Sequence, residues 1–299
     1  MLKTPADIRQ QAFEEKNIRL FVWFRVLFNC RFYYPVLAIF FVDLGLTLSQ
    51  FVILNGIWAL TIVLLEVPSG ALADLIGRKR LVLGSAMLMV FEMLLLLCAP
   101  TNGGWWLFSL CALNRFLAGL AEAAASGADE ALAYDSLQGD NKEKQWDEVL
   151  CTLGRRYAIA MALAMVIGAL VYDSQTFSWL HMHTGIAVPP SSLLIRLPVL
   201  FCLIQGILAV CVAARMKEQY APTLKKESAK IFQQTFEAIR WLWLSKAALV
   251  LILGGVMVDC VSRNFATLTA SSRSLSLPLA SSARGSRWLP SLFPITLNL

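Results

Sequence analysis

The sequence predicts an all-α, polytopic membrane protein with seven membrane-spanning helices. Of its 299 residues, 58% are hydrophobic and only 15% are charged. A soluble globular domain averages about 45–50% apolar and about 25% charged residues. The apolar residues gather in stretches of the roughly 17–25 residues that a helix needs to cross a bilayer. The basic residues gather between those stretches, a pattern that indicates membrane topology and not nucleic-acid binding.

Seven apolar stretches are long enough to span the membrane, at about residues 20–42, 49–69, 81–99, 105–127, 151–172, 194–214 and 247–265. Residues 1–19 are charged and polar, so no cleavable signal peptide is expected there and a cytoplasmic N-terminal segment is predicted. Residues 173–193 are expected to form an exposed loop. His181 and His183 in that loop lack the further ligands that a metal site needs, and no metal or cofactor is expected.

The distribution of lysine and arginine predicts that the N-terminus is cytoplasmic. Basic residues lie before the first span and in alternate connections, at Arg78–Arg80, Lys142–Arg156 and Arg215–Arg240. The connections near residues 43–48, 100–104 and 173–193 contain no Lys or Arg. Cytoplasmic loops of membrane proteins are enriched in these residues, which fixes the orientation. Arg196, near the outer end of the sixth span, is the one cation that departs from this pattern.

Residues 215–246 are predicted to form a cytoplasmic linker that contains an amphipathic helix. Its apolar residues recur at intervals of three to four, at Ile231, Phe232, Phe236, Ile239 and Trp243. Such spacing is typical of a helix lying in the membrane interface.

Ionisable residues within the spans are candidate functional residues, because a charge in the hydrocarbon core is costly. At 1.5 Å per residue, Arg31, Glu92, Arg115 and Asp259 lie roughly 15 Å from the start of their helices, near the bilayer midplane. They either form fixed ion pairs between helices or line a solute path. We favour fixed pairing for Asp259 with Arg263, and a solute path for Arg31 and Arg115, because transporter substrates bind near the midplane.

Helical spacing extends this candidate path. Arg25, Asn29 and Tyr33 fall on one face of the first span, at i, i+4 and i+8. A second face, on the fourth span, combines Arg115 with Gly119, Glu122 and Ser126. The predicted substrate and proton pathway therefore consists of Asn29, Arg31, Glu92, Arg115 and Glu122.

The segment Gly70–Arg80, between the second and third spans, reads G-A-L-A-D-L-I-G-R-K-R. It resembles the G-x-L-a-D-r-x-G-r-k signature that joins the second and third helices of the major facilitator superfamily, with Leu75 where the family usually has a cation. Glycines allow helix ends to approach closely and turn tightly, and Asp74 can pair with the neighbouring cations or with a helix N-terminus. The predicted gating loop consists of Gly70, Asp74, Gly77, Arg78 and Lys79.

The fourth span contains Asn114–Gly119, which resembles the R-x-x-q-G element of the superfamily's fourth helix, with Ala118 in place of glutamine. In antiporters of the family the arginine is implicated in proton coupling, so the resemblance implies that role for Arg115. The fifth span lacks the G-P-x-x-G-G run of many drug–proton antiporters, which counts against drug efflux.

Two further segments, Glu66–Gly70 and Ser126–Leu137, resemble one broad group of bacterial members. This resemblance implies an inner-membrane location. It also implies that Glu66, Asp129 and Glu130 form a gating network with Asp74 and Arg78, which changes partners between inward-open and outward-open states.

The sequence changes character from about Ser271, since residues 271–299 contain no Asp, Glu or Lys and no stretch long enough to span. Low complexity and a lost reading frame are the two interpretations. Superfamily members have two six-helix halves. We therefore expect an incomplete member: an N-terminal bundle at 20–214, the linker at 215–246, a seventh helix at 247–265 and an irregular tail at 266–299.

The resemblance implies a secondary active transporter of a small solute, working by alternating access and inactive or incomplete in this form. A proton is a candidate coupling ion, and self-association is a candidate arrangement in the lipid bilayer. No enzyme is expected, since the sequence has neither a G-x-S-x-G elbow nor a G-x-x-x-x-G-K phosphate loop. The alternative is a non-transporting membrane protein, either a degenerate product or a half that acts only by associating with another chain.

Overall fold

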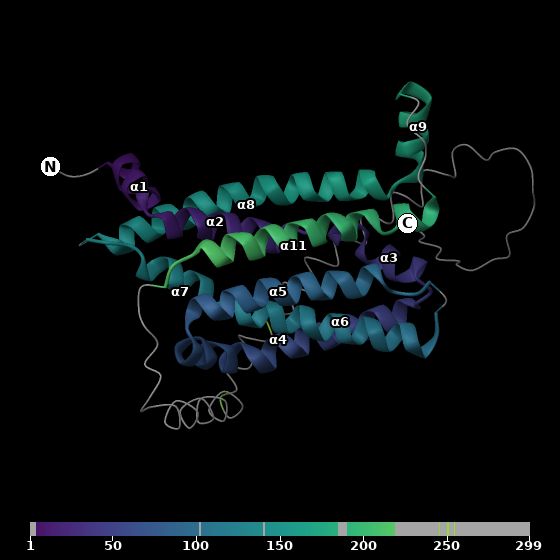
Figure 1. The fold of residues 1–299 in the computed structure, drawn as a ribbon, viewed down its shortest axis with the longest axis horizontal. Helices are drawn as coiled ribbons and strands as arrows, with labels where there is room; N and C mark the ends of the chain where they lie inside the picture. The colour runs from purple at the N-terminus through teal and green to yellow at the C-terminus, as the bar shows by residue number, and fades with distance from the viewer. Residues whose placement is uncertain are drawn as a thin grey trace, which may run out of the picture.

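The computed structural model describes residues 4–101, 103–139, 141–184 and 190–218, and the single residues Ser245, Val250 and Gly254. The described residues form helices and their connections (Figure 1). Six helical segments among them are long and apolar enough to cross a membrane: Lys16–Asp43, Leu48–Ile76, Arg78–Leu97, Gly104–Asp135, Lys142–Tyr172 and Ser192–Arg215. The predicted all-α, polytopic membrane fold is confirmed. The predicted amphipathic helix, seventh span and tail lie outside the described residues.

A short helix, α1 (Pro5–Glu14), precedes the first span, which consists of α2 (Lys16–Asn29), the 3₁₀ turn η1 (Tyr34–Val36) and α3 (Leu37–Asp43). The second and third spans are α4 (Leu48–Ile76) and α5 (Arg78–Leu97). The fourth span divides into α6 (Gly104–Ala125) and α7 (Ala128–Asp135), and the fifth is α8 (Lys142–Tyr172). After α9 (Ser174–Thr184) and α10 (Ser191–Leu194), the sixth span ends with α11 (Leu197–Arg215).

The helices pack in an order that differs from their order in the chain. Helix α6 packs against both α4 and α5, and α11 packs between α5 and α2 (Figure 1). Helix α8 contacts α1, α2 and η1 along one side of the bundle. Only 11% of its most apolar window is buried, the smallest share among the six spans. Most of α8 therefore remains available for lipid or for another membrane segment.

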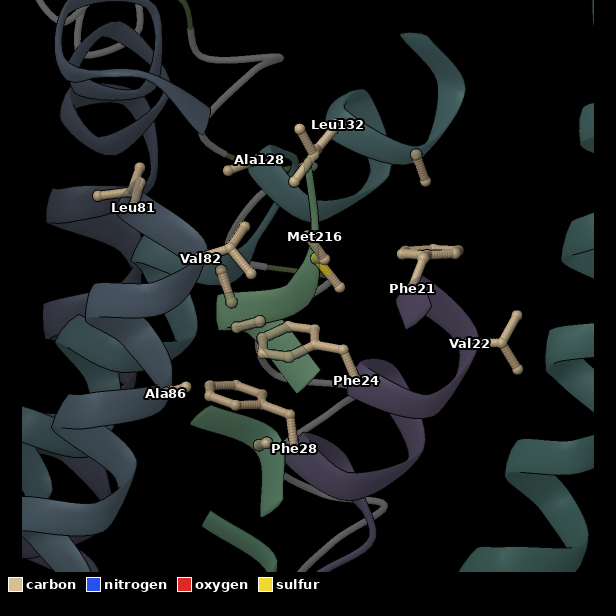
Figure 2. Packing of buried hydrophobic residues seen from close by; sticks show 14 of the residues in the cluster. Phe21, Val22, Phe24, Phe28, Leu81, Val82, Ala86, Ala128, Leu132 and Met216 are labelled. Carbon is tan, nitrogen blue, oxygen red and sulfur yellow. The ribbon is translucent and has the colours of Figure 1, made fainter. Parts of the chain in front are cut away.

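Two clusters of buried apolar side chains fill the bundle, one toward each end. Figure 2 shows the first cluster, where Phe24 and Phe28 of α2 face Val82 and Ala86 of α5. The second cluster includes Phe40, Phe41, Met93 and Leu96. Glycines let helices approach closely: a Cβ at Gly119 of α6 would lie 2.7 Å from the Thr61 Cβ of α4. Such contacts are typical of helices packed within membranes, where small residues bring backbones together.

The prediction of one continuous helix over residues 20–42 is wrong, because the first span breaks between Asn29 and Tyr34. Pro35 explains the break. Its ring removes the backbone donor that would bond to the carbonyl of Arg31 four residues earlier, and it clashes with that carbonyl. Arg25 and Asn29 share one face of α2 as predicted, whereas Tyr33 lies beyond the break, so its predicted place on that face is wrong.

Two other helix boundaries and one additional helix differ from the prediction. Helix α4 continues to Ile76 instead of ending near residue 69, and α8 begins at Lys142 instead of near residue 151. The region expected to be an exposed loop at 173–193 contains α9, on which His181 and His183 are exposed. Hydropathy marks where a chain stops being apolar, whereas these helices continue as polar helices beyond that point.

Candidate functional site

The break in the first span places Arg31 outside regular helix, inside the bundle. Arg31 is 2% exposed, and its guanidinium forms an ion pair with Glu92 of α5, which is fully buried. The same guanidinium donates from Nη1 to the Tyr33 hydroxyl over 3.5 Å, and from Nε to the Phe28 carbonyl over 3.4 Å. The pair joins the first and third spans through charges that the surrounding apolar side chains shield from water.

Arg115 of α6 lies beside this pair and completes a cluster that we call the interior charge cluster: Arg31, Glu92 and Arg115. Its guanidinium lies over the Phe41 ring, 4.9 Å from the centroid. The preceding Asn114 donates from Nδ2 to the Glu92 carbonyl over 2.8 Å, which holds α6 against α5 at this level. Glu92 interacts electrostatically with Arg115 and with Glu122, one of the half-buried residues of α6.

Hydrogen bonding within the interior charge cluster is incomplete. Nε and Nη2 of Arg115, and Oε2 of Glu92, are buried and have no hydrogen-bond partner among the described residues. An unsatisfied polar atom in a buried site costs about 1–3 kcal/mol, and more when the group is charged. Arg115 therefore keeps hydrogen-bond donors, and Glu92 an acceptor, that no described residue satisfies.

One predicted pathway residue, Asn29, lies elsewhere, and Gly119, which was predicted to share a helical face with Arg115, has a packing role. Asn29 is the last residue of α2, and its amide donates to the Arg25 carbonyl over 3.0 Å instead of reaching the cluster. Gly119 serves the packing of α6 on α4. Of the predicted pathway, the structure brings together Arg31, Glu92 and Arg115, with Glu122 in electrostatic contact.

The predicted gating loop is a tight helix–helix junction. Gly77 alone separates α4 from α5, and its φ of +99° is readily adopted only by glycine. A Cβ at this position would lie 2.7 Å from a carboxylate oxygen of Glu218, whose Oε1 accepts a hydrogen bond from the Arg78 amide over 2.7 Å. Gly70 lies within α4 with open space around it, so the prediction that it allows close approach is wrong.

Arg78 is the centre of this junction. It pairs with Asp74 over 3.7 Å, as predicted, and it also forms a hydrogen-bonded ion pair with Asp135 at the end of α7. The side chain of Asp135 is 26% exposed and that of Asp74 is 61% exposed, so the Asp135 pair is the better shielded of the two. Lys79 is the next residue of α5 and is half-buried.

The predicted contact of Asp129 and Glu130 with the Asp74/Arg78 segment is wrong. Both acids, near the start of α7, pair with Arg25 of α2, and Asp129 Oδ2 lies 2.7 Å from Arg25 Nε. Glu66, the third member of the predicted network, accepts a hydrogen bond from the Ser126 hydroxyl over 3.3 Å. The acids near the end of the fourth span therefore connect to two different cations, Arg25 and Arg78.

The sequence analysis missed two residues of these networks, Asp135 and Glu218. It also missed that Arg25 pairs with Asp129 and Glu130. Asp135 belongs to the Ser126–Leu137 segment and carried a signal, whereas nothing in the sequence pointed to Glu218. Arg196, which departs from the charge pattern, donates to the Leu97 carbonyl and, over 2.7 Å, to the Ala99 carbonyl. It satisfies carbonyls at the end of α5, as cations commonly do at helix C-termini.

These features define an integral, polytopic membrane protein with six candidate spans, charges held inside the bundle, and a basic junction between the second and third spans. The chain is similar to the inner membrane transport protein YajR of Escherichia coli strain K12, with 31% identity over 116 residues. The match covers 39% of this chain and 23% of YajR. No family model matches the chain. The chain is thus a distant homologue, over part of its length, of an inner membrane transport protein.

Proposed function

We propose that this chain supplies a six-helix half of a secondary active transporter that moves a small solute by alternating access. In such proteins two helical repeats rock about a site near the bilayer midplane, often formed where a spanning helix is broken. The observation that carries the proposal is the interior charge cluster, which lies next to the break in the first span. The distant similarity to an inner membrane transport protein supports the same conclusion.

The chemistry of the cluster favours an anionic group as the species bound. It contains two guanidinium groups and one carboxylate, and the free donors belong to Arg115. Guanidinium groups bind carboxylates and phosphates in bidentate fashion. Protonation of Glu92 would weaken its hold on Arg31, so a proton is the coupling ion that we propose. Asn29, Glu122 and the Arg115 region would then line the route to the site.

The junction around Arg78 is the proposed cytoplasmic gate. Arg78 connects α4, through Asp74, with α7, through Asp135, and its own backbone amide binds Glu218 at the end of the sixth span. Breaking these contacts would allow the ends of the spans to separate. Gly70, Gly77 and Lys79 belong to the same segment, while Glu66, Asp129 and Glu130 would adjust the neighbouring ends of α4 and α7.

The proposal includes a second bundle opposite the one described. Alternating access requires two units that move against each other, and α8 has most of its apolar surface unburied. A second bundle, in the same polypeptide, in another chain or in a second copy, would cover part of that surface. The alternative function, a membrane protein that acts only by association with another chain, rests on the same exposed surface.

The test uses full-length relatives that keep both arginines, reconstituted in proteoliposomes and offered a defined mixture of metabolites. We expect at least one solute to accumulate in the vesicles, as read by mass spectrometry. The change equivalent to Arg115→Gln should abolish this uptake, and the change equivalent to Arg215→Gln, at an exposed helix end, should leave it intact. Relatives with both arginines that accumulate no solute would overturn the proposal.

A further inference from the structure

We propose that a cavity between α1, α2 and α8 binds the phosphate headgroup of an anionic phospholipid. The cavity has a volume of about 760 Å³. Helix α1 lies against both α2 and α8 at this end of the bundle (Figure 1). Four arginines line the cavity: Arg9 from α1, Arg19 from α2, and Arg155 and Arg156 from α8. This inference goes beyond the proposed transport function and does not depend on it.

The charge in the cavity calls for an anion. The described lining contains four arginines and no acidic residue. None of the four guanidinium groups forms an ion pair within the part of the chain that the structure describes. Guanidinium groups match phosphate geometry through paired hydrogen bonds, and basic pockets between spanning helices bind lipid headgroups.

Two further contacts fit a bound phosphate. The side chain of Thr152 lines the cavity, and its buried hydroxyl has no hydrogen-bond partner among the described residues. The Arg156 guanidinium lies over the Phe13 ring of α1, 5.4 Å from the centroid. This stacking positions the guanidinium beside the cavity and couples α1 to α8.

The apolar part of the cavity wall favours a lipid over a soluble phosphate. Trp23 of α2 and Ile159 of α8 both line the cavity, and they are 57% and 63% exposed. Exposed apolar side chains on spanning helices face acyl chains, and tryptophan is enriched at the level of the headgroups. A lipid would place its phosphate among the arginines and its acyl chains along these two side chains.

The test titrates the purified full-length chain with phosphatidylglycerol and counts bound lipids by native mass spectrometry. We expect Arg155→Gln with Arg156→Gln to weaken binding about 30-fold, at roughly fivefold for each arginine near a phosphate surface. The double change to lysine should keep binding close to wild type. A matched control, Lys144→Gln with Arg215→Gln, removes two exposed cations that do not line the cavity and should have no effect.

Three outcomes would overturn the proposal. The first is unchanged phosphatidylglycerol binding by the double glutamine variant. The second is equal binding of phosphatidylglycerol and the zwitterionic phosphatidylethanolamine by the wild-type chain. The third is displacement of the lipid by equimolar inorganic phosphate, which would identify a soluble anion site. If the double glutamine variant does not keep the wild-type thermal midpoint without lipid, Arg9→Gln with Arg19→Gln replaces it, with the same expected loss.

Discussion

The ion pair between Arg31 and Glu92 joins the first and third spans inside the bundle. Both side chains are almost completely buried. Removing one partner of a buried pair leaves an uncompensated charge, which costs about 3–5 kcal/mol, whereas replacing both by apolar residues is often neutral. The pair is therefore expected to be strongly coupled in stability measurements.

Glu92→Gln should lower the thermal unfolding midpoint of the detergent-purified chain strongly, because it leaves Arg31 buried without its partner. Combining Arg31→Met with Glu92→Leu should recover most of that loss. The control is Glu143→Gln, an exposed acid in the first turn of α8, which should change stability by less than about 0.5 kcal/mol. Equal midpoints for Glu92→Gln and Glu143→Gln would show that the pair does not hold these helices together.

At the proposed gate, Asp135→Asn should open the cytoplasmic side more than Asp74→Asn does. An exposed ion pair contributes about 0–1 kcal/mol, which fits Asp74 at 3.7 Å from Arg78. A charged hydrogen bond that is better shielded contributes about 1.5–3 kcal/mol, which fits Asp135. The measurement is the rate at which a polar thiol reagent labels a cysteine placed at Ser126. Faster labelling in Asp74→Asn than in Asp135→Asn would reverse the assignment.

Which charges lie inside the bundle was predictable, but most of their partners were not. Counting residues along each span placed Arg31, Glu92 and Arg115 near one depth, and the structure brings them together. The partners of Arg25 were missed because the prediction assigned Asp129 and Glu130 to the Asp74/Arg78 segment. The partner Glu218 follows from how the sixth span ends beside the α4–α5 junction, and no local pattern encodes that proximity.

Among the elements, the spans were predictable because the apolar runs are long. The breaks within the spans were not predictable. Hydropathy does not register the loss of a backbone donor at Pro35, yet that loss explains the break that releases Arg31 from the helix. Hydropathy also ends α4 too early, since Asp74 lowers the average without ending the helix. In contrast, the motif predicted the turn at Gly77. The structure shows the positive φ that this turn requires.

The packing of α4 against α6 depends on Gly119. A methyl group there would lie 2.7 Å from Thr61 Cβ and 2.8 Å from the Trp58 carbonyl oxygen, and the latter is backbone that cannot rotate away. Gly119→Ala should therefore destabilise the chain by about 1–3 kcal/mol, as overpacked cores do. Gly154→Ala is the matched control, because that helical glycine has open space around it and alanine favours helix. The measurement compares the thermal unfolding midpoints of the two variants. A smaller loss of stability in Gly119→Ala than in Gly154→Ala would contradict the prediction.

At the scale of the whole molecule, contacts between the described helices separate a closely packed group from α8, which is more loosely attached. Helices α4, α5, α6 and α11 pack closely with one another or with α2, while α8 leaves most of its surface unburied. Each charge in the interior costs about 2.5–3.5 kcal/mol when it stands alone near the centre of a bilayer. The described part of the chain keeps Arg31, Glu92 and Arg115 inside the bundle, which is consistent with a function for the cluster in addition to packing.

The central proposal is that a route past Asn29 leads to the interior charge cluster and opens to water during alternating access, and cysteine accessibility tests it most directly without knowledge of the solute. A cysteine is placed at Asn29, beside the break, in a chain whose native cysteines are replaced. The control is a cysteine at Leu163 of α8, which is 57% exposed on the outside of the bundle. Position 163 also lies within the spanning part of the bundle, about 9 Å along α8 from Tyr157, whose carbonyl oxygen is 3.9 Å from Cys30 Sγ. In membrane vesicles, a charged thiol reagent should label position 29 and leave position 163 unreacted. An unreactive position 29, in vesicles where a surface cysteine at Arg80 labels fully, would contradict the account.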